Sequence, residues 1–564
     1  MTTFSLPQRL AQHADRSGDQ RAIFFRAGND WEAWTWGEYW DRTRRMARGL
    51  RASGVGPGDR VLIVSPDVKS AVTCQLGAWT AGAIPAQLGL PDRLTNIDRF
   101  IDELHPTLRQ LDTNVLLVDR SVAASAAPRP DVRMLVAEDL MEQPPDDAPD
   151  AAPDDTPDVQ RVCGALVQLT SGSTGHPRAV LVPHERLVRH LENISTRLPS
   201  SSSSAGVSWL PVYHDMGLIG GLLYPCFNGF PVYVFSPLDF RRNPYAWLQT
   251  MSRVRATHTS APPSGYAICL RLAARAVDDR LDLSALGCAM IGAEPISPRL
   301  VRQFADAFAP CGFRPEAFFP VYGLAEATVA VTFPEPLTPT RIDAVDRDRF
   351  EREGLALPPL DEAPWIEFVG VGSPLPGTEL SIRDDQGHDL PERSVGEIWI
   401  RSDSLMEGYY GDADATAAVL EDGWLDTGDL GYIADGALFV TGRSKDLIIA
   451  RGRNLMPAAI EEIVSSLPGV RQDCVAAVGV PSEERATEQV CVVAETRADA
   501  EEQRDIAAAV RDVLKMRGIN IDHVIFVPPR TLPRTSSGKI KRRLIVQQLQ
   551  SGLLADLRAA TAIR

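Results

Sequence analysis

The sequence predicts an α/β protein with a large N-terminal domain of layered α/β subdomains and a small α+β C-terminal domain. Helix-type and strand-type patterns alternate in the first third of the chain, as expected for α/β layers. The length of 564 residues provides for about three to five folding units. Helix, strand and helix signals recur in a compact segment beyond TGRSKD (441–446). We therefore predict a large domain at 1–442 and a small domain at 443–564.

The first elements can be placed from local signals. Thr35-Trp36-Gly37-Glu38 forms a possible capping box that opens an amphipathic helix to about Ser53. Glycines in 54–58 then turn the chain, RVLIVS (60–65) predicts a strand, and a helix follows near residues 67–81.

An uncharged run at 216–238 could be mistaken for a membrane span. Its glycines and prolines interrupt the ~20 apolar residues that a spanning helix needs. We expect a buried helix followed by a buried strand, and no transmembrane segment.

Composition argues against nucleic-acid binding and against a disulfide framework, and the N-terminal sequence favours the cytoplasm. The net charge of −16 argues against nucleic acid as a partner, because phosphate backbones are bound by Lys and Arg. Eight scattered cysteines without a CxxC pair indicate small core residues rather than a metal cluster or disulfide framework. The N-terminus lacks an apolar signal core, so we expect a cytoplasmic protein. The Pro/Asp-rich segment 142–158 and the serines at 200–204 are expected to be exposed connectors.

A loop rich in glycine and hydroxyl residues follows the apolar run VCGALVQ. Its residues include Thr170, Ser171, Gly172, Ser173, Thr174, Gly175 and Arg178. Glycines let backbone N–H groups approach phosphate oxygens, and an arginine adds a bidentate cation. The spacing is not that of a Walker A loop. Taken alone, this stretch is either a phosphate cradle or a plain connection.

Six further stretches follow it in order: SWLPVYHDMGLIGG (208–221), VYGLAEAT (321–328), GEIWIRSDSLMEGYYG (396–411), GWLDTGDLGYI (423–433), TGRSKDLIIARGRN (441–454) and PRTSSGKIKR (533–542). Together they resemble the ordered motifs of the acyl-adenylate-forming (AMP-binding) superfamily, which includes acyl-CoA synthetases, peptide-synthetase adenylation domains and luciferases. The closer resemblance is to fatty acyl-AMP ligases, carried by YHDMGLIGGLL (213–223), SPLDFRRNPYAWL (236–248), RATHTSAP (255–262) and GAEP (292–295). Residues 334–368 resemble the insertion of that branch, which is thought to restrain a mobile C-terminal domain.

The resemblance implies ATP-dependent activation of a carboxylic, here fatty, acid to acyl-AMP with release of pyrophosphate, and ATP and Mg²⁺ as cofactors. It also implies acyl transfer to the phosphopantetheine thiol of an acyl carrier protein or carrier domain, in lipid, polyketide or lipopeptide biosynthesis. An acyl-CoA synthetase and a non-catalytic nucleotide-binding paralogue remain as alternatives. The 334–368 segment favours the carrier-dependent enzyme over the first alternative.

The resemblance also assigns catalytic roles. Lys539 matches the lysine that bridges carboxylate and α-phosphate, Glu326 matches the Mg²⁺ ligand, and His214 matches a histidine beside the acyl carboxylate. Thr174 is implied as a second metal ligand. A capping carboxylate at Glu326 and a structural histidine at His214 are the competing interpretations.

Nucleotide binding is assigned in the same way. Asp429 matches the carboxylate that accepts hydrogen bonds from both ribose hydroxyls, and Arg443 would support the ribose or a phosphate nearby. Lys445 occupies the hinge position. The implied adenine slot consists of Gly292, Ala293, Glu294, Pro295 and Tyr322. Gly323, Leu324 and Ala325 are implied as further cofactor-binding residues.

The chain departs from the family pattern at several positions. Arg178 and Ala179 replace the usual Lys and Gly, and these two changes motivate the non-catalytic alternative. Further departures are Ile291 for Asn, Pro263 and Ser264 for Asn-Phe, and Asp426 for Arg. Because 263–264 lies near the expected acyl pocket, the acid is expected to be unusual.

A basic stretch follows the catalytic loop. Lys541, Arg542 and Arg543 are predicted to dock an acidic carrier protein, with a solvated helix start as the alternative.

Overall fold

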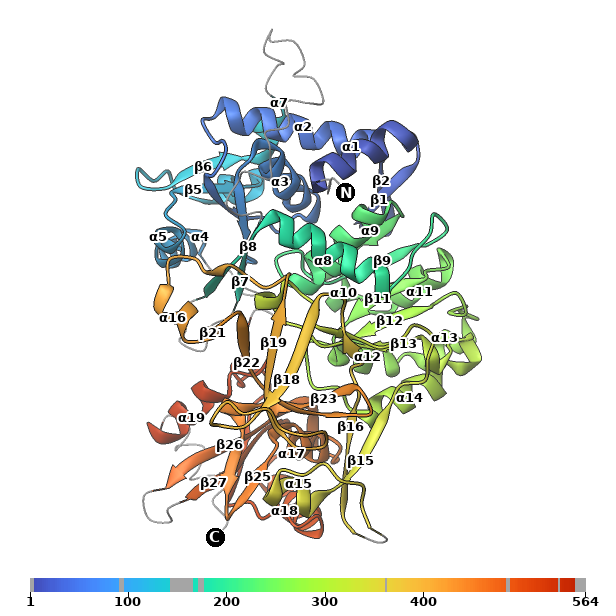
Figure 1. Cartoon of the computed structure of the whole chain (residues 1–564), viewed down its shortest axis with the longest axis vertical. Helices are drawn as coiled ribbons and strands as arrows, with labels where there is room; N and C mark the ends of the chain where they lie inside the picture. The colour runs from blue at the N-terminus through green and yellow to red at the C-terminus, as the bar shows by residue number, and fades with distance from the viewer. Residues whose placement is uncertain are drawn as a thin grey trace.

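The computed structural model describes residues 5–90, 96–142, 166–170, 177–360, 363–482, 487–535 and 538–552. Large sheets and their helices fill most of the molecule, and the C-terminal unit lies at the lower end in Figure 1. Within the described ranges, no helix is both long and apolar enough to cross a membrane.

Two seven-stranded sheets organise the large domain. In the first, all strands but the last run parallel; its order is β13 (Phe318–Pro320), β12 (Cys288–Ile291), β11 (His258–Ala261), β9 (Gly206–Ser208), β10 (Val232–Val234), β1 (Arg21–Ala27) and β2 (Asp30–Thr35). In the second, β8 and β20 join antiparallel to a parallel set; its order is β20 (Gly408–Tyr409), β8 (Arg178–Val182), β7 (Leu166–Thr170), β4 (Ile84–Gln87), β3 (Arg60–Val64), β5 (Val115–Val118) and β6 (Arg133–Val136).

Helices join the two sheets through one apolar core. Trp36 and Tyr39 of α2 (Trp36–Ala52), Trp79 of α3 (Val68–Ala81) and Leu187 of α8 (His184–Arg197) are at most 3% exposed and share a cluster with strands of both sheets. The remaining helices of this part are α1 (Leu6–Ser17), α4 (Ile97–Glu103), α5 (His105–Gln110), α6 (Arg120–Ser125) and α7 (Ala137–Glu142). The predicted α/β layering is therefore confirmed.

Several local predictions can be compared directly. Thr35 Oγ1 accepts the N–H of Glu38, and Glu38 Oε2 accepts the N–H of Thr35, which is the predicted capping box. The strand at Arg60–Val64 and the helix at Val68–Ala81 are also confirmed. Of the segment 142–158, only Glu142 is described.

The uncharged run at 216–238 forms a buried helix and then β10, as predicted. Its first part is π-helical, η3 (Met216–Leu223), and it continues as α9 (Tyr224–Asn228). A Cβ on Gly217 would lie 2.2 Å from the Pro211 carbonyl oxygen, so the backbone packs too closely there for any side chain. The π-helix was not predicted, because the apolar pattern indicates burial but not the hydrogen-bond register. Such turns are frequent at functional sites.

A second apolar core, rich in aromatic side chains, packs on the face of the first sheet opposite the core described above. Its helices are α10 (Pro237–Arg242), α11 (Tyr245–Arg253), α12 (Pro263–Leu270), α13 (Ala273–Asp278) and α14 (Pro298–Phe308). Trp247, Tyr266, Phe304 and Phe318 are at most 2% exposed and make edge-to-face contacts in one cluster. This cluster fixes α12 and α14 against β11–β13.

A five-stranded sheet forms the part of the large domain next to the C-terminal unit. It contains β18 (Thr378–Arg383), β19 (Gly396–Ser402), β22 (Trp424–Ala434), β21 (Leu420–Glu421) and β23 (Ala437–Arg443). The predicted insertion forms β15 (Ile342–Asp346), α15 (Arg347–Glu353) and most of β16 (Trp365–Val369). Phe350 and Phe368 of this segment share a core with Tyr432 and Phe439 of the sheet.

The C-terminal unit has its own cores. Its elements are η7 (Ser444–Asp446), β24 (Ile448–Ala450), β25 (Arg453–Leu455), α17 (Pro457–Ser465), β26 (Val470–Ser482), β27 (Thr487–Thr496), α18 (Ala500–Met516), β28 (His523–Val527) and α19 (Arg542–Gln550). Two apolar clusters consist wholly of residues from Ile448 onward. The small α+β domain is thus present, and the boundary at 442/443 stays a prediction.

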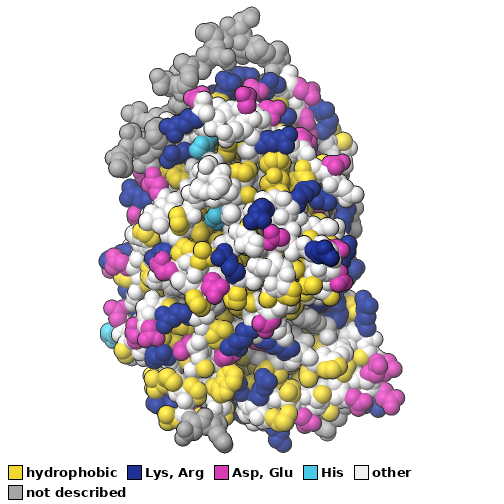
Figure 2. Space-filling view, turned by 90° about the vertical axis from the view of Figure 1, so that its right-hand side faces the viewer, with side chains coloured by type: hydrophobic (Ala, Val, Ile, Leu, Met, Phe, Trp, Pro, Cys, Tyr) yellow, Lys and Arg dark blue, Asp and Glu magenta, His cyan; other side chains and the backbone are white. Residues whose placement is uncertain are grey.

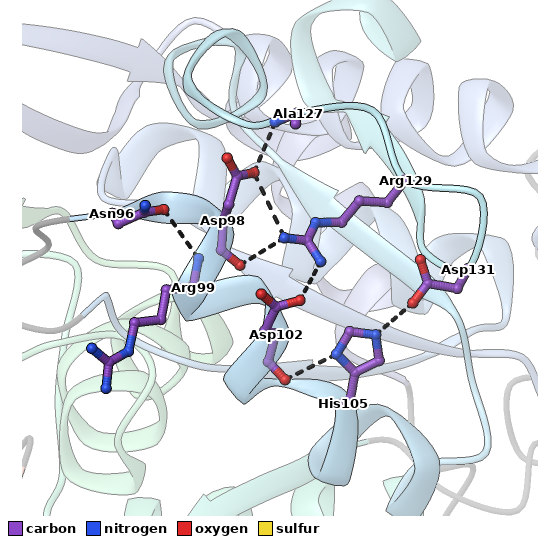
Figure 3. A network of polar contacts seen from close by, with 8 residues as sticks. All are labelled: Asn96, Asp98, Arg99, Asp102, His105, Ala127, Arg129 and Asp131. Atoms are coloured by element: carbon purple, nitrogen blue, oxygen red, sulfur yellow. Dashed lines mark hydrogen bonds and ion pairs between the residues drawn. The ribbon is translucent and has the colours of Figure 1, made fainter.

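A network of polar contacts joins α4 and α5 to the segment that precedes β6, the last strand of the second sheet (Figure 3). Arg129 contacts the carbonyl oxygen of Asp98 at 2.8 Å and the Asp102 carboxylate. His105 donates from Nδ1 to the Asp102 carbonyl oxygen at 2.9 Å and from Nε2 to Asp131 at 2.6 Å. Both ring nitrogens face acceptors, which favours the imidazolium, and the contact with Asp131 raises the pKa of His105.

Seven of the eight cysteines lie in the described ranges, and these seven are free thiols. Six are buried and Cys474 is half-buried. This agrees with their prediction as small core residues.

Candidate active site

The predicted site residues gather where strands of the first sheet end. The loops after β9, β12 and β13 carry His214, the 292–295 loop and Glu326. In parallel α/β sheets, ligands bind at these carboxyl ends. Thr170 and Arg178 come from the second sheet, where they pair across β7 and β8.

Asp429 is the centre of one cluster. This carboxylate is 7% exposed, and it accepts a hydrogen bond from the Tyr322 hydroxyl at 2.7 Å and an ion pair from Arg443 Nε at 3.1 Å. Burial raises the pKa of Asp429, and Arg443 and Tyr322 oppose the rise. Because an ionised carboxylate offers about four lone-pair sites, both oxygens can accept further donors.

Glu326 is the centre of a second cluster. The Tyr409 hydroxyl donates to Glu326 Oε1 at 2.8 Å, and Arg178 Nη1 donates to the same hydroxyl at 3.3 Å. The Arg178 guanidinium also lies over the Tyr409 ring, 4.9 Å from its centroid. Tyr409 therefore links the end of the 170–178 loop to Glu326.

Close backbone packing shapes the loops around these clusters. A Cβ on Gly323 would lie 1.7 Å from the Val329 carbonyl oxygen. Ala293 has φ +66°, a left-handed conformation that costs a non-glycine residue ~1 kcal/mol or more. The surroundings hold this loop in a shape that the chain would not adopt alone.

His214 lies on the loop that leads into η3. Its Nε2 is buried and has no hydrogen-bond partner among the described residues. Burial, followed by the charge of Lys539, lowers the pKa of His214 to about 4. The ring is therefore neutral at neutral pH. Buried ring nitrogens are normally hydrogen-bonded, so the unpartnered Nε2 marks His214 as a candidate for contact with a substrate.

Lys539 reaches this site from the small domain. Its side chain is exposed on a tight loop in which the Lys539 N–H donates to Thr535 Oγ1 at 3.1 Å. Burial raises the pKa values of Asp215, Glu294 and Asp429, and the Lys539 charge opposes that rise in all three. The ammonium is thus within electrostatic range of residues that precede it by more than 100 positions.

Sequence profiles of two known families match the chain. The profile described as "AMP-binding enzyme" matches residues 10–410, and "AMP-binding enzyme C-terminal domain" matches residues 459–539. The chain belongs to the AMP-binding enzyme family. It is an adenylate-forming ligase, and the predicted family is confirmed.

Relatives of this AMP-binding enzyme match it over nearly their whole length. The medium-chain-fatty-acid–acyl-carrier-protein ligase JamA of Moorena producens is 31% identical, over 93% of this chain and 91% of that one. The long-chain-fatty-acid–AMP ligase FadD26 of Mycobacterium marinum is 31% identical, over 98% of each chain. A solved structure from studies of "fatty acyl-adenylate ligases from E. coli and L. pneumophila" is 32% identical, with a TM-score of 0.87 over 98% of each chain.

The structure brings together most residues that the sequence assigned. The Lys539 charge lowers the pKa values of His214, Glu294 and Asp429, and Tyr322 and Arg443 both contact Asp429. Lys445 is exposed in η7, beside Asp446. Ser171, Gly172, Ser173, Thr174 and Gly175 lie outside the described residues. The roles assigned to all these residues stay predictions.

One sequence-based prediction is wrong. Arg542 is not part of a free basic surface, because its guanidinium pairs with Glu461 at 2.7 Å and with Asp446 at 3.2 Å. Two carboxylates already neutralise it, and reversing its charge would break the junction at η7. Lys541 and Arg543 are exposed.

Tyr409 contacts two candidate site residues, and sequence reasoning did not single it out. It lies within a quoted motif, GEIWIRSDSLMEGYYG, but nothing local shows that its hydroxyl meets Glu326, 83 positions away. A tyrosine beside glycines in a motif was the available signal.

Proposed function

We propose that this ligase activates a fatty acid as its acyl-AMP and then transfers the acyl group to the phosphopantetheine thiol of an acyl carrier protein, in lipid, polyketide or lipopeptide biosynthesis. The observation that carries the first step is the convergence of Lys539 with the buried groups His214, Glu294 and Asp429. The names of JamA and FadD26 support the acid and the acceptor.

The residues present fit ATP. Asp429 offers acceptor oxygens for the ribose hydroxyls, and Arg443 and Tyr322 hold it in place. Of the glycine- and hydroxyl-rich stretch assigned to the phosphates, the described residues Thr170 and Arg178 pair across β7 and β8, and Arg178 donates to the Tyr409 hydroxyl at 3.3 Å.

Mg²⁺ also fits, through Glu326. This ion is usually held by one or two carboxylates together with substrate phosphates and waters. The described residues contain no cluster of three or more His, Cys, Asp or Glu side chains that could hold a metal alone. When bound, Mg²⁺ would neutralise phosphate charge beside Glu326, and Thr174 is proposed as its second ligand.

The chain's own residues then serve an in-line displacement. A carboxylate oxygen of the acid forms a bond to the α-phosphorus, and the bond to the pyrophosphate oxygen breaks. Lys539 supplies a positive charge where the two anions meet, and neutral His214 orients the carboxylate.

The insertion supports a restricted acceptor. Asp343 anchors it to the large domain through the Tyr432 hydroxyl at 2.8 Å and Arg393 at 3.0 Å. Glu351 and Asp348 of α15 hold Arg453 of the small domain at 3.1 and 2.8 Å. We propose that this contact limits small-domain motion, with the domain boundary at 442/443 and Lys445 as the hinge.

An acid panel tests the first step. Purified protein with ATP and Mg²⁺ should release pyrophosphate when a fatty acid is added, and not when an amino acid with a similar number of carbon atoms is added. Release with amino acids alone would overturn the proposed substrate class.

A further inference from the structure

The loop at 292–295 is held by a second element that neither the motif nor the family resemblance assigns. Glu294 turns back from this loop to the first turn of α12. One carboxylate oxygen accepts the Ser264 N–H at 3.1 Å, and the other accepts the Ser264 hydroxyl at 3.1 Å. Both oxygens of Glu294 are therefore engaged by one residue.

The helix needs this external partner. Its N-cap is Pro262 and Pro263 follows, so the cap has no side-chain oxygen to satisfy the first N–H groups of α12. Glu294 supplies that acceptor from 30 positions away. A negative charge at a helix N-terminus is also favourable for the dipole.

The contact brackets the strained part of the loop. Tyr266 of α12 donates its hydroxyl to the Met290 carbonyl oxygen at 3.0 Å, before the loop begins. Ser264 holds Glu294 after the strained residue Ala293. Gly292 lies between these points, where a Cβ would be 2.7 Å from the Val321 carbonyl oxygen. The backbone at 291–294 is thus fixed on both sides of its left-handed residue.

We propose that Ser264 is a positioning residue for nucleotide binding: by holding Glu294 to α12, it keeps the 292–295 loop in the shape that receives the adenine. This inference deepens the proposed function and rests on it.

The test compares Ser264→Ala with Ser264→Thr. Loss of one hydrogen bond to a charged group should raise the KM for ATP about tenfold, while kcat stays within about twofold. Ser264→Thr retains the hydroxyl and should restore the KM for ATP. Thr35→Ala removes a comparable cap from α2, far from the site, and should lower stability without moving this KM.

Two results would overturn the proposal. One is an unchanged KM for ATP in folded Ser264→Ala; the other is an equal rise in Thr35→Ala. Pyrophosphate release by the wild type in the same assay separates this inference from the proposed function, because failure of the latter would abolish the signal in every variant.

Discussion

The small domain is held on two sides, and the two contacts differ in chemistry. On the insertion side, Arg453 is 18% exposed and pairs with Glu351, which is 6% exposed, while Phe350 packs near Met456. On the side of α12 and α14, Arg271 contacts Gln472 at 2.7 Å and Ser297 contacts Glu462, both at the surface. Figure 1 shows the insertion (α15, β15, β16) directly beside the small domain.

The difference indicates where release is costly. Separating a largely buried ion pair leaves an uncompensated charge, whereas exposed polar contacts exchange with water at little cost. We infer that the insertion contact, rather than the α12/α14 contact, sets how readily the small domain leaves the position that brings Lys539 to the site.

Lys539→Ala gives the largest expected effect, because it removes the small domain's contribution to the chemistry. Adenylation should fall ~10²–10³-fold, since the lysine acts on charge that develops in the transition state. ATP affinity should stay within a few-fold. Pyrophosphate exchange and equilibrium ATP binding check both parts; near-normal exchange would remove Lys539 from the mechanism.

Arg453→Ala should loosen the insertion side alone. Loss of this partner should weaken the domain contact by ~2 kcal/mol, or about 30-fold in the released population, and increase acyl transfer to CoA. Solution scattering and a CoA thioester assay measure the two effects.

Arg451→Ala is the matched control for this variant. Arg451 lies two positions before Arg453 in the chain, and it pairs with Asp522 at 2.7 Å inside the small domain. If both variants behave alike, the insertion contact is not the restraint. Deleting 334–368 is a poorer test, because Tyr432 and Phe439 would lose their apolar partners.

Tyr409→Phe should have a smaller effect, confined to the large-domain half of the site. Without the hydroxyl, Glu326 loses its link to Arg178, and the Mg²⁺ concentration for half-maximal activity should rise about tenfold. A Mg²⁺ titration of pyrophosphate release measures this. An unchanged titration would show that Tyr409 does not position Glu326.

His105→Ala should have the smallest effect, limited to stability. Asp131 raises the pKa of His105 above its usual 6.5, so the contact stabilises the fold fully below pH 6.5 and is lost as pH rises through the raised pKa. His105 and Arg129 hold the pKa values of Asp131 and Asp102 below 3.8, so the contact fails again at strongly acidic pH. Thermal unfolding should differ between variant and wild type most near pH 5–6, and the difference should shrink as pH rises through the raised pKa; a pH-independent difference would contradict this reasoning.

The sequence predicted elements whose causes are local. The Thr35–Glu38 capping box and the buried run after Met216 depend on neighbours in the chain. Arg542 was misread because Glu461 lies 81 positions away, and Tyr409 was missed for the same kind of reason. Motif resemblance predicts Lys539 and Asp429 as site residues, but the partners that position such residues come from distant segments that no local pattern connects.

Surface charge likewise depends on contacts that the sequence alone does not reveal. The chain carries a net charge of −16, yet the face in Figure 2 has basic and acidic side chains interspersed. A partner that met this face would find a locally mixed surface, so net charge alone does not predict where a carrier protein docks. Lys541 and Arg543 remain proposed contacts, while Arg542 is already neutralised.

The most direct test of the central claim measures where the activated acyl group goes. Acyl-AMP is formed on the purified enzyme from a fatty acid and ATP, and the complex is then mixed with either a carrier protein bearing phosphopantetheine or CoA at equal thiol concentration. We predict that the carrier thioester forms at least about tenfold faster than the CoA thioester. The reason is that the insertion holds the small domain in a position that hinders access of CoA to the acyl-AMP. Equal rates, or faster transfer to CoA, would contradict the account.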